Sequence, residues 1–191
     1  MEKKLNGKKV AILVAEGFKQ VEMTGPRQAL EGAGAVTEIV SPAEGEVQGW
    51  NHFDKGDKFK VDVPLAEADP SDFDALLLPG GVANPDQLRM KPEAVEFVKA
   101  FFDAGKPVAA ICHAPWTLIE AGVVRGRTMT SWPSVKTDLI NAGAQWVDRE
   151  VVTDNGLVTS RKPDDIPAFN EKMIEEFAEG EHRAQKAAAR S

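Results

Sequence analysis

Short apolar runs alternate with helical segments along this chain, and the alternation restricts the fold more than any other feature of the sequence. The apolar runs occupy residues 10–15, 37–41, 75–78 and 108–111, and helical patterns lie between them at 20–31 and 92–104. Strands rich in apolar residues are covered on both faces, as in a parallel sheet. The chain is therefore predicted to form an α/β domain with a doubly wound, mostly parallel sheet and helices on both faces.

The second half of the chain continues the pattern with shorter elements. Helices are expected at residues 113–121, 134–141 and 164–178, and strands at 145–148, 151–153 and 157–160. Asp154, Asn155 and Gly156 form a turn cluster, which predicts a hairpin between the last two strands. Residues 43–60, with their Gly, Glu, Lys and Asp content, are expected to form a surface excursion.

Length and composition are those of one compact domain. The chain has 191 residues, of which 42% are hydrophobic and 28% charged,. We expect the domain to span residues 1–179, followed by a polar tail at 180–191 that frays. The apolar run at 10–15 is too short for a signal peptide or a membrane span, and a single cysteine cannot form an internal disulfide. A cytoplasmic protein is therefore expected.

The charge balance bears on the partners of the chain. The net charge is −7, and lysine and arginine are spread along the sequence. A negative protein without basic clusters is not steered toward phosphate backbones, so nucleic acid is not an expected partner. A small molecule or a peptide is expected instead.

Cys112 is the only cysteine, and it stands between a predicted strand and a predicted helix. Ala110 and Ala114 flank it at two positions on either side. This small-x-Cys-x-small pattern is related to the Gly-x-Ser-x-Gly elbow, whose tight turn strains the nucleophile. A helix is expected to begin directly after Cys112, and its macrodipole and free N–H groups would favour the thiolate. His113 could act as a base, and its backbone N–H as an oxyanion donor. The alternative is a buried, inert core cysteine.

Two further features belong to the same edge of the predicted sheet. Leu78 is followed by Pro79, Gly80 and Gly81, and paired glycines let backbone N–H groups approach a ligand closely,. Glu22 lies between apolar neighbours and, if buried at this edge, would share a proton with the cysteine sulfur. The simpler alternatives are an ordinary turn and a solvated glutamate that favours the start of a helix.

Five segments together resemble the PfpI-type intracellular protease family. They read VAILVAEGFKQVEMTGP, DALLLPGG, GKPVAAICHAP, NAGAQWVDREVV and TSRKPDDIPAFN. The family belongs to a superfamily that includes the Parkinsonism-associated protein deglycase and the class I glutamine amidotransferases. The resemblance extends from about residue 9 to residue 177. It implies a flavodoxin-like fold and a Cys-His active site in which Cys112 is the nucleophile and His113 its neighbour.

The same resemblance implies roles for four other positions. Glu22 matches the glutamate that hydrogen-bonds the cysteine and helps to keep it ionised, and Gly81 matches an oxyanion donor. Trp132 stands on the substrate side, where many relatives have tyrosine. Asp86 matches an acidic residue supplied by an adjacent subunit, which implies a homo-oligomer, a dimer or a hexamer. Without the resemblance, Asp86 is explained as a turn or helix-cap residue.

Two classes of function follow. The first is a stress-related cysteine hydrolase or lyase in which the Cys112 thiolate attacks a carbonyl, acting as an intracellular peptidase or on aldehydes and glycated substrates. The second is a redox-sensing or chaperone-like stress protein whose cysteine is oxidised without turnover. A glutaminase subunit is disfavoured, because no histidine occurs between His113 and His182 to complete the expected His-Glu pair.

The remaining polar residues predict no metal or cofactor. His52 and His182 have no partner at metal-ligand spacing, and no dinucleotide-binding glycine pattern is present,. Arg161 is interpreted either as a ligand for an anionic substrate or as a solvated side chain. Asp164 and Asp165 are expected to favour the start of the last helix electrostatically.

Overall fold

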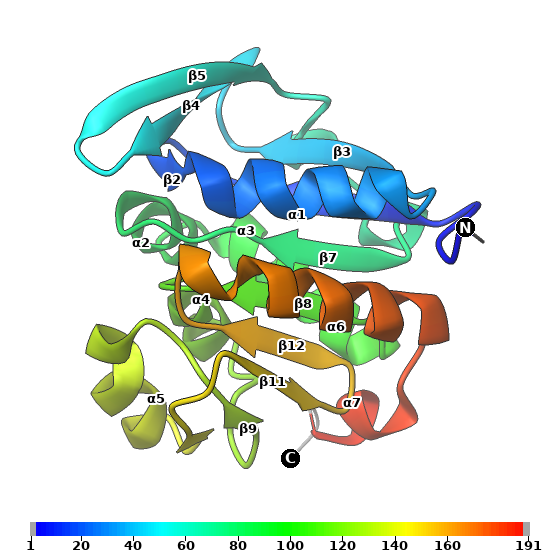
Figure 1. Ribbon diagram of the computed structural model, residues 1–191, viewed down its shortest axis with the longest axis vertical. Helices are drawn as coiled ribbons and strands as arrows, with labels where there is room; N and C mark the ends of the chain where they lie inside the picture. The colour runs from blue at the N-terminus through cyan, green and yellow to red at the C-terminus, as the bar shows by residue number, and fades with distance from the viewer. Residues whose placement is uncertain (1–2, 189–191) are drawn as a thin grey trace.

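The computed structural model describes residues 3–188, which form a seven-stranded sheet covered by helices (Figure 1). In spatial order its strands are β11 (Val151–Asp154), β12 (Leu157–Ser160), β8 (Val108–Ile111), β7 (Ala75–Leu78), β1 (Lys9–Leu13), β3 (Val36–Ser41) and β6 (Val63–Pro64). Every neighbouring pair is parallel except the β11–β12 hairpin. The chain runs outward from β1 to β6 and then crosses to β7 on the other side of β1. The predicted doubly wound, flavodoxin-like sheet is confirmed.

Helices cover both faces of the sheet, as expected. On one face lie α1 (Gln20–Gly32) and α6 (Ile166–Glu179), and on the other α2 (Ala83–Arg89), α3 (Pro92–Ala104) and α4 (Pro115–Glu120) (Figure 1). The strands separate two buried clusters because successive side chains point to opposite faces. In β1, for example, Val10 and Ile12 pack with α1 and α6, whereas Ala11 and Leu13 pack with α3.

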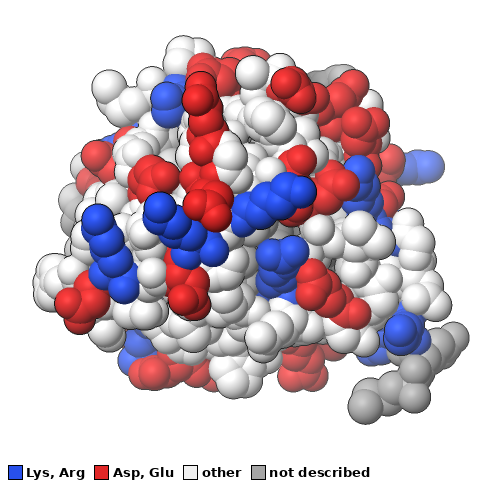
Figure 2. All heavy atoms as spheres, turned by 90° about the horizontal axis from the view of Figure 1, so that it is seen from above, with Lys and Arg blue, Asp and Glu red and all other residues white. Residues whose placement is uncertain are grey.

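The surface excursion expected at residues 43–60 is a β-hairpin, and its strands were not predicted. Its strands are β4 (Glu46–Asn51) and β5 (Asp54–Lys60). A two-residue strand, β2 (Phe18–Lys19), pairs with β4 on the side away from β5. The hairpin is held by Val47, which is fully buried, and by contact of the Phe59 and Phe18 rings at 5.7 Å. Basic and acidic side chains are interspersed over this end of the molecule (Figure 2).

The helices and strands predicted for the second half of the chain are present, several with shifted ends, among them β10 (Gln145–Trp146) and α5 (Lys136–Asn141). The strand β9 (Thr128–Met129) and the single turns Leu65–Glu67, Pro70–Asp72, Pro133–Val135 and Pro163–Asp165 were not predicted as separate elements. The helix expected at 113–121 begins at Pro115, three residues beyond Cys112. Proline suits the first turn of a helix because it lacks the N–H that would have no partner there. The predicted helix start directly after Cys112 was therefore wrong.

The tail from residue 180 was expected to fray, but its described part packs against the domain. The N–H of His182 donates to the carbonyl of Gly105 at 2.7 Å, and Gln185, within α7 (Arg183–Ala188), is fully buried. His182 also lies 3.2 Å from Glu176 and 3.8 Å from Glu179, so it has the carboxylate neighbours that its place in the sequence did not suggest. Residues 189–191 lie outside the described part.

Crossing a bilayer needs a long apolar helix, and none of the helices within residues 3–188 meets that requirement,.

Candidate active site

Cys112 occupies a strained turn at the carboxyl end of β8. Its φ is 66°, a left-handed conformation that costs a residue other than glycine about 1–2 kcal/mol,. Two hydrogen bonds hold this backbone in place. The N–H of Cys112 donates to the carbonyl of Ser160 at 3.0 Å, and the carbonyl of Cys112 accepts from the N–H of Trp132 at 2.9 Å. The elbow expected from the sequence is present, and these hydrogen bonds hold the Cys112 backbone in its strained conformation.

The glycine loop after β7 closes directly against this elbow. A side chain at Gly80 would overlap both Cys112 and the Glu22 carboxylate, so only glycine allows so close an approach,. Gly81 has a φ of 84°, which glycine adopts readily. The buried amide of Asn84 holds the loop by donating to the carbonyls of Pro79 and Gly80 at 2.9 and 3.1 Å. The sequence did not single out Asn84, since asparagine after a turn is ordinary.

A cavity of about 730 Å³ lies at the carboxyl ends of the strands, beside the crossover between β1 and β7. Ligands of open α/β sheets bind at such a place. Four of the predicted residues line the cavity, namely Gly81, Cys112, His113 and Trp132. Cys112 is only 4% exposed, yet its exposed part faces this cavity, so a ligand that enters can reach the sulfur.

Glu22 lies beneath the cavity, fully buried beside Cys112. Burial raises the pKa of Glu22 from its ordinary value of 4.5 to about 7, and the charge of Lys19 opposes the rise,. Among the described residues neither carboxylate oxygen has a well-aligned hydrogen-bond partner. The prediction that Glu22 is buried near the sulfur is therefore met, and the solvated alternative is excluded.

Burial and the negative charge of Glu22 raise the pKa of the Cys112 thiol. The N–H groups of Gly81 and His113 lower this pKa but do not offset the rise. The predicted easy ionisation by a helix macrodipole was wrong, because burial raises the thiol pKa and α4 begins only at Pro115. An ionised Glu22 opposes the thiolate, so the buried pair carries one negative charge above about pH 7,.

His113 contacts the sulfur through its side chain. Its Nδ1 lies 3.2 Å from Cys112 Sγ, and its Nε2 lies 3.2 Å from the hydroxyl of Ser134. Burial, with the charge of Lys19, lowers the pKa of His113 to about 4, so the imidazole is neutral at pH 7,. The ring stacks on Trp132, with centroids 6.1 Å apart. A neutral imidazole fixed in this way can accept or return a proton at the sulfur.

Replacement of Glu22 by glutamine tests its raised pKa through stability. Below pH 4.5 folded and unfolded wild type both bind the proton. As pH rises toward 7 only the folded state keeps the proton on Glu22, so the contribution of Glu22 to the free energy of unfolding is lost. We expect the free energy of unfolding of Glu22→Gln, relative to wild type, to increase by about 3 kcal/mol across that window. Urea unfolding at several pH values measures the difference, and a difference that is constant with pH would contradict the raised pKa.

Asp86 lies in α2 on the surface and does not line the cavity. Its carboxylate pairs with Arg89 at 2.6 Å, and the Arg89 guanidinium lies over the ring of Trp116, 4.6 Å from its centroid. Trp116 in turn packs against His113. Within one chain Asp86 therefore reaches the site only through two other side chains, and its proposed action across a subunit boundary stays a prediction.

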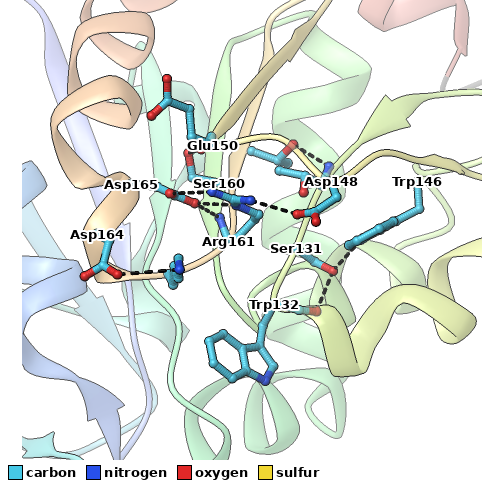
Figure 3. Close-up of polar contacts among 12 residues, drawn as sticks. Ser131, Trp132, Trp146, Asp148, Glu150, Ser160, Arg161, Asp164 and Asp165 are labelled. Carbon is cyan, nitrogen blue, oxygen red and sulfur yellow. Dashed lines mark hydrogen bonds and ion pairs between the residues drawn. The ribbon is translucent and has the colours of Figure 1, made fainter.

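Arg161 is neither the solvated arginine nor the anion ligand considered from the sequence. Its guanidinium is held between Asp165, at 2.9 Å, and Asp148, at 2.8 Å (Figure 3). Asp165 is buried and also accepts from the N–H of Arg161, instead of acting only on the helix start. This cluster fixes the chain just beyond Ser160, the residue that supports the Cys112 backbone.

Several residues of the site gave no signal in the sequence. Trp50, His52 and Phe53 come from the β4–β5 hairpin and form part of the cavity wall, although His52 was set aside as a residue of a charged segment. Their position depends on a hairpin that was not predicted. The only group among the described residues that could hold a metal ion is Glu176, Glu179 and His182. It lies near the amino end of β8, whereas Cys112 follows the carboxyl end of that strand.

Comparisons with known proteins agree with this fold. The model of the DJ-1/PfpI family matches residues 8–176. A Bacillus subtilis protein named "Putative cysteine protease YraA" is 46% identical over 168 residues, which cover 87% of this chain and 96% of the relative. A deglycase of Pyrococcus abyssi is 44% identical over 166 residues, covering 87% and 97%. The crystal structure of Drosophila melanogaster DJ-1beta superposes with a TM-score of 0.81 at 29% identity, covering 96% of each chain.

Proposed function

The chain belongs to the DJ-1/PfpI family, as its motifs predicted, and on this premise we propose that it is a cysteine-dependent hydrolase or lyase whose sulfur attacks a carbonyl carbon. One observation carries the proposal: Cys112 is held in a strained turn on the wall of a cavity of about 730 Å³. A strained nucleophile in a pocket is the arrangement that covalent catalysis needs. The names of the relatives, a cysteine protease and a deglycase, support the same chemistry.

The first step is addition to the carbonyl group. The sulfur of Cys112 forms a bond to carbon, the π electrons of the carbonyl move to oxygen, and the thiol proton passes to Glu22. A carboxylate with a pKa of about 7 suits a general base at neutral pH,. The N–H groups of Gly81 and His113, which face the sulfur, are placed to bind the resulting oxyanion,.

The intermediate has two fates that depend on the substrate. A 2-oxoaldehyde gives a thiohemiacetal, in which a base moves the hydrogen of the first carbon to the second to form a thioester. Water then releases a 2-hydroxy acid, with no external oxidant. A peptide would instead lose its amine and leave an acyl-enzyme for water to hydrolyse. Because Cys112 is only 4% exposed, the geometry favours small or extended carbonyl compounds over folded proteins.

Product analysis tests the proposal. The protein is incubated with methylglyoxal and, separately, with glycated and unmodified peptides, and the products are identified by NMR and mass spectrometry. Lactate or released sugar-derived acid supports the aldehyde or deglycase reaction, and peptide fragments support a peptidase. Absence of all products, together with oxidation of Cys112 by dilute peroxide, would overturn the enzyme proposal in favour of a redox sensor.

A further inference from the structure

Lys19 places a positive charge beside the reacting groups. It precedes the first residue of α1, and its backbone N–H donates to the carbonyl of Gly80 at 3.2 Å, which fixes it against the glycine loop. The residue lines the same cavity as Cys112. Its charge lowers the pKa of Glu22 and of His113, so its field extends over the atoms that react.

Within the described part of the chain this charge has no acidic partner. Among the described side chains no carboxylate lies within ion-pair distance of Lys19. Arg161 gives the contrast, because Asp148 and Asp165 flank its guanidinium (Figure 3). Glu16, the acidic residue of the cavity wall, accepts instead from the backbone N–H of Gln48 at 3.0 Å.

The rest of the wall makes an anion at this position more favourable. Trp50, Phe53 and Val82 contribute large apolar surfaces to the cavity. Apolar walls lower the local dielectric and so strengthen the attraction between an ammonium and a ligand's negative charge. Of the residues described, Lys19 is the only lysine or arginine in the wall of this cavity, and His113 is neutral at pH 7 because its pKa is about 4.

We propose that the Lys19 ammonium binds an anionic group of the substrate, so that the site selects carbonyl compounds that also bear a carboxylate. The inference rests on the proposed function only in that Cys112 is the attacking group. Lys19 makes and breaks no bond, and it acts by attracting and orienting the substrate.

A pair of isosteric alkylating agents tests this without any turnover. In each case the Cys112 thiolate displaces iodide and a carbon–sulfur bond forms, with negative iodoacetate or with neutral iodoacetamide. Because the same thiolate attacks both reagents, the ratio of their rate constants does not depend on the thiol pKa. We expect Lys19→Met to lower the iodoacetate-to-iodoacetamide ratio about fivefold, which is the effect of losing a partly exposed ion pair. Lys19→Arg should keep the ratio high because it keeps the positive charge.

Two controls make the result specific. Lys58→Met removes a lysine of the same hairpin region that does not line this cavity, and it should leave the ratio unchanged. In wild type the ratio should fall as salt is raised, because screening weakens a partly exposed charge. This salt series also tests the proposal if Lys19→Met fails to fold. A ratio that is unaffected both by the substitution and by salt would overturn it.

Turnover supplies the second arm of the test. With phenylglyoxal and 4-carboxyphenylglyoxal as neutral and anionic substrates, Lys19→Met should reduce kcat/KM for the anionic compound about fivefold more than for the neutral one. Equal losses for both compounds would overturn the role of Lys19. If neither compound reacts in wild type, the proposed reaction with aldehydes fails, and the alkylation ratio still decides whether Lys19 attracts anions.

Discussion

Replacement of Cys112 by serine should lower kcat for the carbonyl substrate by about a thousandfold or more. A serine hydroxyl is a far weaker nucleophile than sulfur, and Glu22, with a pKa of about 7, cannot ionise it. The strained backbone should survive, because its hydrogen bonds to Ser160 and Trp132 involve only main-chain atoms of Cys112. The assay follows product formation under saturating substrate, with thermal unfolding measured on the same samples.

Loss of turnover with an unchanged melting temperature would assign the chemistry to the sulfur. A variant that unfolds earlier is compared with Cys112→Ala, which removes the polar atom as well. Turnover that persists in both variants would show that the reaction does not pass through Cys112, and the proposed mechanism would be wrong.

Replacement of Gly80 by alanine should damage both the site and the fold. The added Cβ would lie 2.6 Å from the Cβ of Cys112 and 2.7 Å from the carbonyl oxygen of Ile111, distances that packed atoms do not adopt. Overpacking of this kind costs about 1–3 kcal/mol, and displacement of the elbow by about 1 Å costs about a hundredfold in rate. We expect a melting temperature lower by several degrees and a kcat about a hundredfold lower.

Gly32→Ala is the matched control. Gly32 ends α1 with open space around the position of a Cβ, and its φ is not in the left-handed region. The substitution should leave kcat unchanged and the stability equal or slightly higher. If Gly80→Ala behaved like this control, the close approach of the glycine loop to Cys112 would not hold in solution.

The fold and the elbow could be predicted from local patterns. The predicted bounds of β7 and β8 are those of the structure, because strands buried on both faces appear in the sequence as continuous apolar runs,. Cys112 could be recognised because small residues and a preceding buried strand are both visible in sequence. Glu22 was ambiguous, since a glutamate at a helix start is more often a solvated residue that favours the helix electrostatically.

The parts that sequence did not predict depend on contacts between distant segments. The strand β5 reads DKGDKFK, which has no apolar alternation, and it forms because β4 pairs with it and Phe59 reaches Phe18. The ionisation of Cys112 was predicted in the wrong direction because the helix was assumed to begin at the sulfur. Burial and the neighbouring Glu22 determine that pKa, and both appear only once the chain has folded.

The alkylation rate of Cys112 by iodoacetamide, measured from about pH 5 to about pH 9, tests the central claim most directly. If the sulfur faces the cavity and passes its proton to Glu22, the rate should rise through an inflection near pH 7, because burial raises the pKa of that carboxyl group to about 7,. In Glu22→Gln the inflection should move to higher pH. A sulfur that is not labelled across this range, or a profile that is identical in wild type and Glu22→Gln, would contradict the account.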